Sequence, residues 1–296
     1  MIDLIVSQGR VADRKPRMIE GAARIARALE QRYGLAGRWI GEPAPAADDD
    51  WSESLPQAEG QLSALGRAVG ESIRAGHRTV LVSNTCPASI GTLPVVAREL
   101  PEAVVLYIDG HGDFNTPATS SGYLGGMVLS AACGLWESGH GGGLPVSQAV
   151  LVGTRDIDEG EAELIAKAGV RVIPPAETTA ENILEAIGDR PVWVHIDWDV
   201  LEPGHVPADY TVPDGLLPEQ IRMVFETIPA DRLLGVELAE FDATTDEEQN
   251  ERAVAVVLDM VAPVFENVPA SVPTNVPASV PTNVSGNLVA SAFAGR

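Results

Sequence analysis

Two short acidic motifs come directly after runs of β-branched residues in this chain of 296 residues. The motif DGHGD (residues 109–113) follows the run Ala103–Ile108, and DWD (residues 197–199) follows the run Val192–Ile196. Residues at i, i+2 and i+4 of an extended segment project to the same side. Ligands of open α/β sheets bind beyond the carboxyl ends of the strands. We therefore expect both motifs to direct their polar side chains at one point.

The chemistry that these motifs favour is metal binding. Four carboxylates at one point repel one another, and burial adds to that cost. Divalent cations remove the conflict, and one imidazole with several carboxylates forms a hard oxygen and nitrogen ligand set that suits Mn²⁺. Two such ions about 3.5–4 Å apart can share carboxylates and hold a bridging hydroxide. DGHGD alone also fits a glycine-rich surface turn, an alternative that the second motif disfavours.

The segments around the motifs alternate between short β-branched runs and longer helical patterns. This alternation indicates an α/β fold with a parallel sheet covered by helices on both faces. The expected strands are Ile2–Ser7, Thr79–Ser83, Ala103–Ile108, Ala149–Gly153, Val170–Ile173, Val192–Ile196 and Leu233–Glu237. The expected helices are Met18–Tyr33, Gln57–Ala75, Gly160–Ala168, Ala180–Ile187, Pro218–Thr227 and Glu247–Met260. Between them, Gly41–Trp51 has the composition of an exposed acidic loop.

The composition excludes several classes of protein. A formal net charge of -22 disfavours binding to nucleic acid and to anionic membranes. The two cysteines, Cys86 and Cys133, are too few for a disulfide framework. The N-terminus has no basic region followed by an apolar stretch, and no run of about 18 apolar residues occurs, so neither a signal peptide nor a transmembrane helix is indicated. We expect a cytoplasmic protein whose oligomeric state the sequence leaves open.

The C-terminal segment differs in kind from the rest of the chain. The eight-residue unit NVPASVPT occurs at Asn267–Thr274 and again at Asn275–Thr282, and no charged residue occurs from Asn267 to Gly295. Proline at every fourth position excludes a helix or a central strand, and two copies are too few for a solenoid. We expect residues 266–296 to be a disordered tail with no catalytic part.

Four segments, in order, resemble motifs of the arginase family of ureohydrolases, which includes arginases and agmatinases. YIDGHGDFNTP (Tyr107–Pro117) resembles the D-A-H-x-D motif with the Asn-Thr-Pro that follows it in arginases. HIDWDVLEPGHVPA (His195–Ala208) resembles the S-x-D-x-D-x-x-D-P motif, and GTRDIDEGE (Gly153–Glu161) and GVELAEFD (Gly235–Asp242) match two further segments. The resemblance covers residues 1–265. It implies a catalytic domain folded as a three-layer α/β/α sandwich around a parallel sheet of roughly eight strands.

The resemblance also implies which side chains hold two Mn²⁺ ions. Asp109 and Asp197 correspond to the carboxylates that bridge the two metals. Asp113 would complete the shell of one metal and take part in catalysis, and His111 and Asp199 would complete the shell of the other.

Substrate contacts carry over from the same segments. Glu240 would pair with the substrate guanidinium as a catalytic residue, and its alternative is a solvated loop acid. Asn115 and Ser121 fit the positions that bind an α-carboxylate. Asp158 would hold the α-amino group with Glu161 through water, although both also fit helix N-terminal acids favoured by the helix dipole. This set favours an amino-acid substrate over agmatine, which has no carboxylate.

Two positions depart from the family pattern. The first metal histidine of the family lies in a G-G-D-H-S stretch, and the corresponding segment here is SNTCPASIGTL (Ser83–Leu93), with Cys86 at the place of the histidine. We expect Cys86 to be a weaker ligand for Mn²⁺, and a buried, inert thiol is the alternative. A covalent role is not expected, because no second histidine in the motifs stands ready to activate the thiol. Gly125 lies close to where arginases carry a histidine credited with proton transfer.

Cysteine at this position is also similar to the branch of the family that hydrolyses Nω-hydroxy-L-arginine in D-cycloserine biosynthesis. The framing segments MIDLIVSQGRVADR and ADYTVPDG resemble that branch. The resemblance implies a metal-dependent amidinohydrolase that forms hydroxyurea and L-ornithine from a small amino-acid substrate. Arginase or another guanidino-acid hydrolase, and a non-catalytic binding protein on the same fold, are the alternatives.

Overall fold

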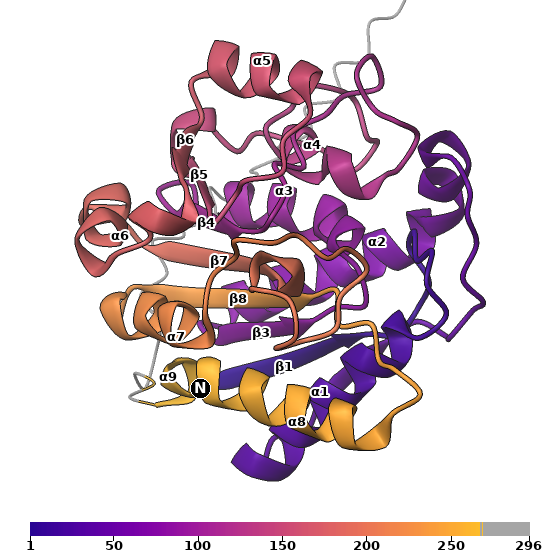
Figure 1. Cartoon of the computed structure of the whole chain (residues 1–296), viewed down its shortest axis with the longest axis vertical. Helices are drawn as coiled ribbons and strands as arrows, with labels where there is room; N and C mark the ends of the chain where they lie inside the picture. Colours follow the sequence, from indigo (N-terminus) through magenta and orange to yellow (C-terminus); the bar gives the residue numbers. More distant parts are fainter. Residues whose placement is uncertain (267, 269–296) are drawn as a thin grey trace, which may run out of the picture.

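Eight parallel strands form one sheet within the part of the chain that this computed structural model describes, residues 1–266 and 268 (Figure 1). Their order across the sheet is β2-β1-β3-β8-β7-β4-β5-β6, and each neighbouring pair is parallel. The strands are β1 (Ile2–Ser7), β2 (Arg38–Ile40), β3 (Arg78–Val82), β4 (Val104–Ile108), β5 (Ala149–Val152), β6 (Arg171–Ile173), β7 (Val192–Asp197) and β8 (Leu233–Ala239). The predicted α/β architecture with a roughly eight-stranded parallel sheet is confirmed.

Helices cover both faces of this sheet and complete three layers (Figure 1). One face carries α1 (Met18–Tyr33), α6 (Ala180–Ile187), α7 (Pro218–Thr227), α8 (Glu247–Met260) and α9 (Ala262–Phe265). The other face carries α2 (Trp51–Arg74), α3 (Ser89–Glu99), α4 (Val128–Ala132) and α5 (Glu159–Ala168).

The buried strands alternate their side chains between the two helical layers. In β4, Leu106 and Ile108 join the core on one face, whereas Val105 and Tyr107 join the core on the other. A parallel sheet is covered on both faces, so its strands read as continuous apolar runs. That property explains why the central strands were predictable from the sequence.

Apart from end shifts of one or two residues, five strands and α-helices differ from the sequence-based expectations: β2, α2, α3, α4 and α9. The edge strand β2 was not predicted, because three half-buried residues, Arg38–Ile40, give no pattern. Helix α2 begins at Trp51, six residues before the expected start at Gln57, because Asp50 caps it and accepts a hydrogen bond from the Ser52 N–H. Helix α3 was not predicted either. It contains a proline, and its Gly91 has no room for a Cβ beside the Leu62 carbonyl of α2.

The topology brings the carboxyl ends of five neighbouring strands, β3, β8, β7, β4 and β5, to one edge of the sheet. The segments that follow these strands carry the residues singled out above. Among the described residues, no helix is both long and apolar enough to span a membrane. The predicted tail lies outside the described residues, apart from residues 266 and 268, so its disorder stays a prediction.

Candidate metal centre

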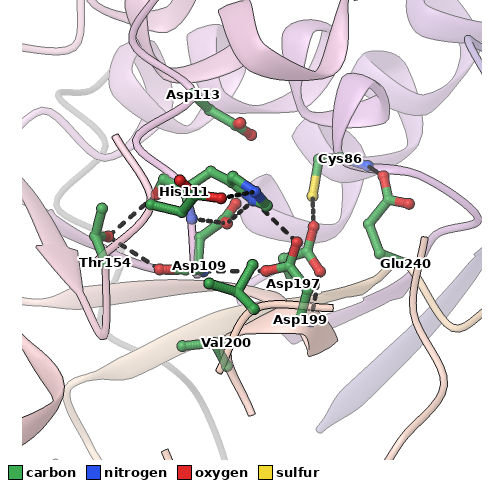
Figure 2. A network of polar contacts seen from close by, with 12 residues as sticks. Cys86, Asp109, His111, Asp113, Thr154, Asp197, Asp199, Val200 and Glu240 are labelled. Carbon is green, nitrogen blue, oxygen red and sulfur yellow. Dashed lines mark hydrogen bonds and ion pairs between the residues drawn. The ribbon is translucent and has the colours of Figure 1, made fainter. Parts of the chain in front are cut away.

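The two acidic motifs converge at this edge, as predicted. His111 Nδ1 lies 3.0 Å from Asp199 Oδ2 and 3.5 Å from Asp109 Oδ1, so one imidazole joins carboxylates from β4 and β7 (Figure 2). Asp197 and Asp113 are buried and line the same cavity, although Asp113 belongs to none of the groups of candidate ligand atoms described below. The strand order explains this convergence, because β4 and β7 are hydrogen-bonded neighbours.

Backbone hydrogen bonds hold the two motifs in place. Asp199 Oδ1 accepts the Gly110 N–H at 3.0 Å, and Asp109 Oδ1 accepts the His111 N–H at 2.7 Å. Each motif therefore organises its own turn and also contacts the other one. Asp113 has a φ of 48°, a left-handed conformation that costs free energy for a residue with a side chain and is found at functional sites.

Arg155 fixes the loop that carries Tyr210, a residue beside His111. Its guanidinium donates to backbone carbonyls only, among them those of Asp199 at 3.0 Å, Gly153 at 3.0 Å and Val212 at 2.6 Å. Burial lowers the pKa of Arg155. Its hydrogen bonds connect the end of β5 to the loop that carries Tyr210, whose ring meets that of His111 edge-on with centroids 5.2 Å apart.

Cys86 lies inside the cluster rather than beside it. Its Sγ is 3.2 Å from Asp197 Oδ2 and 3.2 Å from His195 Nε2, and the residue is 2% exposed (Figure 2). The expectation that no second histidine in the motifs stands ready beside this thiol was wrong, because His195 belongs to the motif HIDWDVLEPGHVPA. His195 was assigned to strand β7, and strand order alone brings it next to Cys86.

The surroundings of Cys86 favour a metal ligand over a nucleophile. Burial, and then the charge of Asp197, raise the pKa of the Cys86 thiol well above its usual value. A nucleophilic cysteine needs the opposite, an electropositive setting that stabilises its thiolate. Bound cations would supply that positive charge.

Glu240 reaches the cluster from the end of β8. Its Oε1 accepts hydrogen bonds from the Cys86 N–H at 2.6 Å and from the Thr85 hydroxyl at 2.7 Å, whereas its buried Oε2 has no partner (Figure 2). Its φ is 68°, a strained value for glutamate. Burial raises the pKa of Glu240 well above its usual value. The alternative of a solvated loop acid does not fit a residue that is 4% exposed.

The electrostatics of the cluster call for positive charge. Burial is the main cause that raises the pKa values of Asp113 and Asp197 well above normal, and it also raises that of Asp199. Neighbouring carboxylates add to each of these shifts. Asp109 Oδ2 is buried without a hydrogen-bond partner, which is a costly arrangement unless something binds there.

Candidate ligand atoms gather into three overlapping groups. The ligand atoms within each group lie within 4.8 Å of one another. The groups are Cys86–Asp109–His195, Cys86–Asp197–Glu240 and Asp109–His111–Asp199. Asp109 and Cys86 each belong to two groups, so the donor set suits more than one cation.

The predicted substrate-binding residues line the same cavity, which has a volume of about 240 Å³. Asn115 is buried, and its side-chain Oδ1 has no partner. Ser121 and Asp158 are exposed at the cavity, and the Asp158 carboxylate makes no capping hydrogen bond to helix α5. Glu161 is buried instead, and its Oε1 accepts the Phe114 N–H at 2.7 Å. Glu161 therefore supports the loop after β4 as well as lining the cavity.

Three cavity residues were not predicted from the sequence. Tyr123 lies outside the segments that were singled out, whereas Asp156 and Tyr210 lie in GTRDIDEGE and ADYTVPDG but were assigned no role there. A Cβ on Gly125 would overlap the Tyr123 ring, so this tyrosine occupies the space of the side chain that position 125 lacks. A tyrosine two residues before a glycine has no recognisable pattern, and only the folded loop reveals the relationship.

Comparisons with known proteins agree with this geometry. The sequence model of the Arginase family matches residues 3–262. The Nω-hydroxy-L-arginine amidinohydrolase of Streptomyces lavendulae is 71% identical over 271 residues, which are 91% of this chain and 99% of that protein. The arginase of Bacillus caldovelox is 28% identical over 212 residues, 66% of this chain and 71% of that protein.

A solved structure shows the same fold. The crystal structure of arginase from Bacillus cereus superposes with a TM-score of 0.77 at 23% identity, and the match covers 89% of this chain and 97% of that one. The family model spans the sheet and the segments that carry the metal centre. The chain belongs to the arginase family.

Proposed function

We propose that this protein is a metal-dependent amidinohydrolase that converts Nω-hydroxy-L-arginine and water to hydroxyurea and L-ornithine. The observation that carries the proposal is the 71% identity to the Streptomyces lavendulae enzyme over 99% of its length. The cavity supports it, because both the acidic cluster and polar side chains suited to an α-amino acid line it.

The residues present fit a pair of divalent cations. The buried Asp109 Oδ2 without a partner offers a lone pair to a cation, and crowded carboxylates at this point need positive charge. Asp109 and Asp197 would be shared between two Mn²⁺ ions, with Cys86 and Asp113 completing one site and His111 and Asp199 the other. When bound, the cations would activate the attacking water and polarise the guanidino carbon as Lewis acids.

Glu240 is proposed to bind the guanidino end of the substrate. Its Oε1 is held by the Cys86 N–H and by Thr85, so the carboxylate cannot turn away, and its Oε2 is free to accept a hydrogen bond. At the other end, Asn115 and Ser121 would bind the α-carboxylate and Asp158 the α-amino group. These contacts orient the substrate with its guanidino carbon toward the acidic cluster.

The reaction adds water across one carbon–nitrogen bond. The bond between the guanidino carbon and the substrate Nδ breaks, the carbon keeps the incoming oxygen and leaves as hydroxyurea, and Nδ gains a proton and leaves as the side-chain amine of L-ornithine. The hydroxyl lowers the basicity of the hydroxyguanidine, so more of it is neutral at pH 7 than of arginine. A neutral substrate is easier to attack, which fits a site that has glycine at position 125.

Four further features belong to the proposal: the metal, the location, the biosynthetic context and the partner. Manganese is the proposed metal because oxygen and nitrogen ligands dominate the set. The proposed location is the cytoplasm, and the proposed context is D-cycloserine biosynthesis, both by resemblance to the same branch of the family. The proposed partner is the small amino-acid substrate, with no nucleic acid and no membrane.

Specificity constants test the substrate. The Mn²⁺-loaded enzyme should give a kcat/KM for Nω-hydroxy-L-arginine that is at least about a hundredfold above that for L-arginine, with hydroxyurea as a product. A higher kcat/KM for arginine would identify an arginase. A protein that binds metal but turns over neither substrate would be the non-catalytic alternative.

A further inference from the structure

Three polar side chains form a buried row beneath the metal centre. Tyr107 of β4 pairs with His195 of β7, and His195 pairs with Glu237 of β8, so the three residues are in register across neighbouring strands. Residues in register project from the same face of a sheet. All three have an exposed fraction of 0%, and the rings of Tyr107 and His195 stack with centroids 4.3 Å apart. Burying such a row inside a sheet costs free energy unless its polar groups are hydrogen-bonded.

Tyr107 and His195 of this row each contact a predicted metal ligand. The Tyr107 hydroxyl donates to Asp113 Oδ2 at 2.5 Å, and His195 Nε2 shares a hydrogen with Cys86 Sγ at 3.2 Å. Cys86 and Asp113 are the two side chains assigned to one metal alone. The row therefore contacts the ligands of one metal site only. The ligands of the other site, His111 and Asp199, are held by contacts within the loops that follow β4 and β7.

Helix α3 holds the third residue of the row, Glu237, in place. Glu237 Oε2 lies 3.1 Å from His195 Nδ1 and accepts the Ser89 hydroxyl, and Glu237 Oε1 accepts the Thr92 hydroxyl at 2.6 Å. A carboxylate beside Nδ1 fixes the orientation of an imidazole. Only Nε2 is then left to face the sulfur.

We infer that His195, oriented by Glu237, is a positioning residue that holds the Cys86 sulfur at the metal site which Asp113 completes. The inference rests on the proposed function, because it takes Cys86 to be a ligand. His195 contacts neither the substrate cavity nor the reacting atoms; it acts through the sulfur. A cysteine side chain is shorter than a histidine side chain, and the imidazole of His195 fills the space behind it.

Two substitutions at position 195 separate this role from simple packing. In His195→Gln the amide nitrogen can reach the place of Nε2 and keep the hydrogen bond to Sγ. In His195→Asn the shorter amide can reach Glu237 and Ser89 but not the sulfur. We expect His195→Asn to bind one Mn²⁺ as the wild type does and the second about tenfold to a hundredfold more weakly, the range seen for outer-shell partners, and His195→Gln to stay near wild type.

Cobalt substitution gives a readout that does not depend on catalysis. With Co²⁺ bound, the wild type and His195→Gln should show sulfur-to-cobalt charge-transfer absorption, and His195→Asn should lose or shift it. Native metal affinity together with an unchanged band in His195→Asn would overturn the inference. A wild type that binds fewer than two metal equivalents would instead contradict the proposed function.

A double-mutant cycle shows whether the effect passes through the sulfur. In a Cys86→Ala background, His195→Asn should cause no further loss of Mn²⁺ affinity. An equal loss in both backgrounds would mean that His195 acts independently of the sulfur, either as a structural residue or as a metal ligand itself, and would overturn the inference. If His195→Asn does not fold, Glu237→Gln replaces it: it should weaken the same metal site, and unchanged metal affinity would count against the inference.

Discussion

The Tyr123 ring fills the space that a side chain on Gly125 would need. Position 125 is close to where arginases carry a histidine credited with proton transfer, and here a phenol replaces the imidazole in that volume. The Tyr123 side chain also contacts Thr85, which donates to Glu240. Burial raises the pKa of Tyr123 well above its usual value, so the phenol keeps its proton at neutral pH.

Gly125→His should therefore lower kcat/KM for Nω-hydroxyarginine by about tenfold or more, because an overpacked site costs about 1–3 kcal/mol. Gly125→His combined with Tyr123→Ala should relieve the overlap and raise the arginine-to-hydroxyarginine activity ratio. Gly126→Ala is the matched control, since the nearest atom to its added Cβ is 3.8 Å away. Steady-state kinetics on both substrates decide the matter. An active Gly125→His enzyme with unchanged selectivity would contradict this account.

Asp109→Asn tests the shared carboxylate. The variant keeps an oxygen that can accept the His111 N–H, so the loop should survive, but it loses the negative charge between the two sites. Metal content and activity should fall together, with kcat/KM down by roughly a thousandfold because Lewis-acid activation is worth several kcal/mol. Asp189→Asn is the control, because Asp189 is exposed, pairs with Arg232 and precedes β7, at the edge of the sheet opposite to the metal centre. Full metal content in Asp109→Asn would refute the assignment.

The convergence of Asp109 and Asp197 was predictable, because each follows a buried strand and parallel strands end at the same edge. Their neighbours His195 and Glu237 were not. Both lie inside strands among apolar residues, a pattern that predicts core positions. Their contacts with Cys86 and with each other depend on the strand order β3-β8-β7, which periodicity does not reveal.

The cavity wall was predictable only in part for a similar reason. Asn115, Ser121 and Asp158 occupy positions to which the family resemblance assigns a role, whereas the place of Tyr210 in the cavity depends on a loop whose path is set by the hydrogen bonds of Arg155. Loop paths depend on such tertiary contacts and not on local sequence. The strained φ of Glu240 is likewise a property of the folded segment.

Cys86→His tests whether position 86 has room for an imidazole beside His195. The family pattern alone suggests that histidine at position 86 should improve Mn²⁺ binding. In this structure the sulfur already lies 3.2 Å from both His195 and Asp197, so a second imidazole has no room. We expect the single variant to lose metal affinity and melt several degrees lower, since overpacking costs about 1–3 kcal/mol.

Adding His195→Ser to Cys86→His should restore both metal binding and stability, because the smaller side chain frees the space. His195→Ser alone is the control and should weaken the Cys86 site. Calorimetric titration with Mn²⁺ and thermal melting measure the two effects. Native metal binding and an unchanged melting temperature in Cys86→His alone would show that a second imidazole does fit beside His195.

Asp158→Ala should raise KM for an α-amino acid substrate about tenfold to a hundredfold with little change in kcat, since a hydrogen bond to a charged group is worth about 1.5–3 kcal/mol. Glu159→Ala is the matched control: it removes an acid from the same helical turn of α5, and Glu159 does not line the cavity. Kinetics on the two variants separate substrate binding from a helix-dipole effect. Equal KM values in both variants would favour the alternative that Asp158 only stabilises the N-terminus of α5 through the helix dipole.

Glu161→Gln tests the pH dependence of stability. Burial raises the pKa of Glu161 from 4.5 to about 7. Between these values the folded protein holds a proton on Glu161 that the unfolded chain has released. The contribution of Glu161 to stability is therefore present below about pH 4.5, falls as the pH rises, and is lost above about pH 7. Glutamine keeps the oxygen that accepts the Phe114 N–H but cannot ionise.

The free energy of unfolding of the wild type relative to Glu161→Gln should thus fall by at most about 3.5 kcal/mol between pH 4.5 and pH 7, since one pKa unit corresponds to about 1.4 kcal/mol, and stay level above pH 7. Urea unfolding of both chelator-treated proteins at several pH values measures it. Glu163→Gln, on the solvent side of the same helix, should give a flat difference. A wild type that gains stability relative to Glu161→Gln as the pH rises would mean that the folded protein stabilises the Glu161 carboxylate rather than its protonated form.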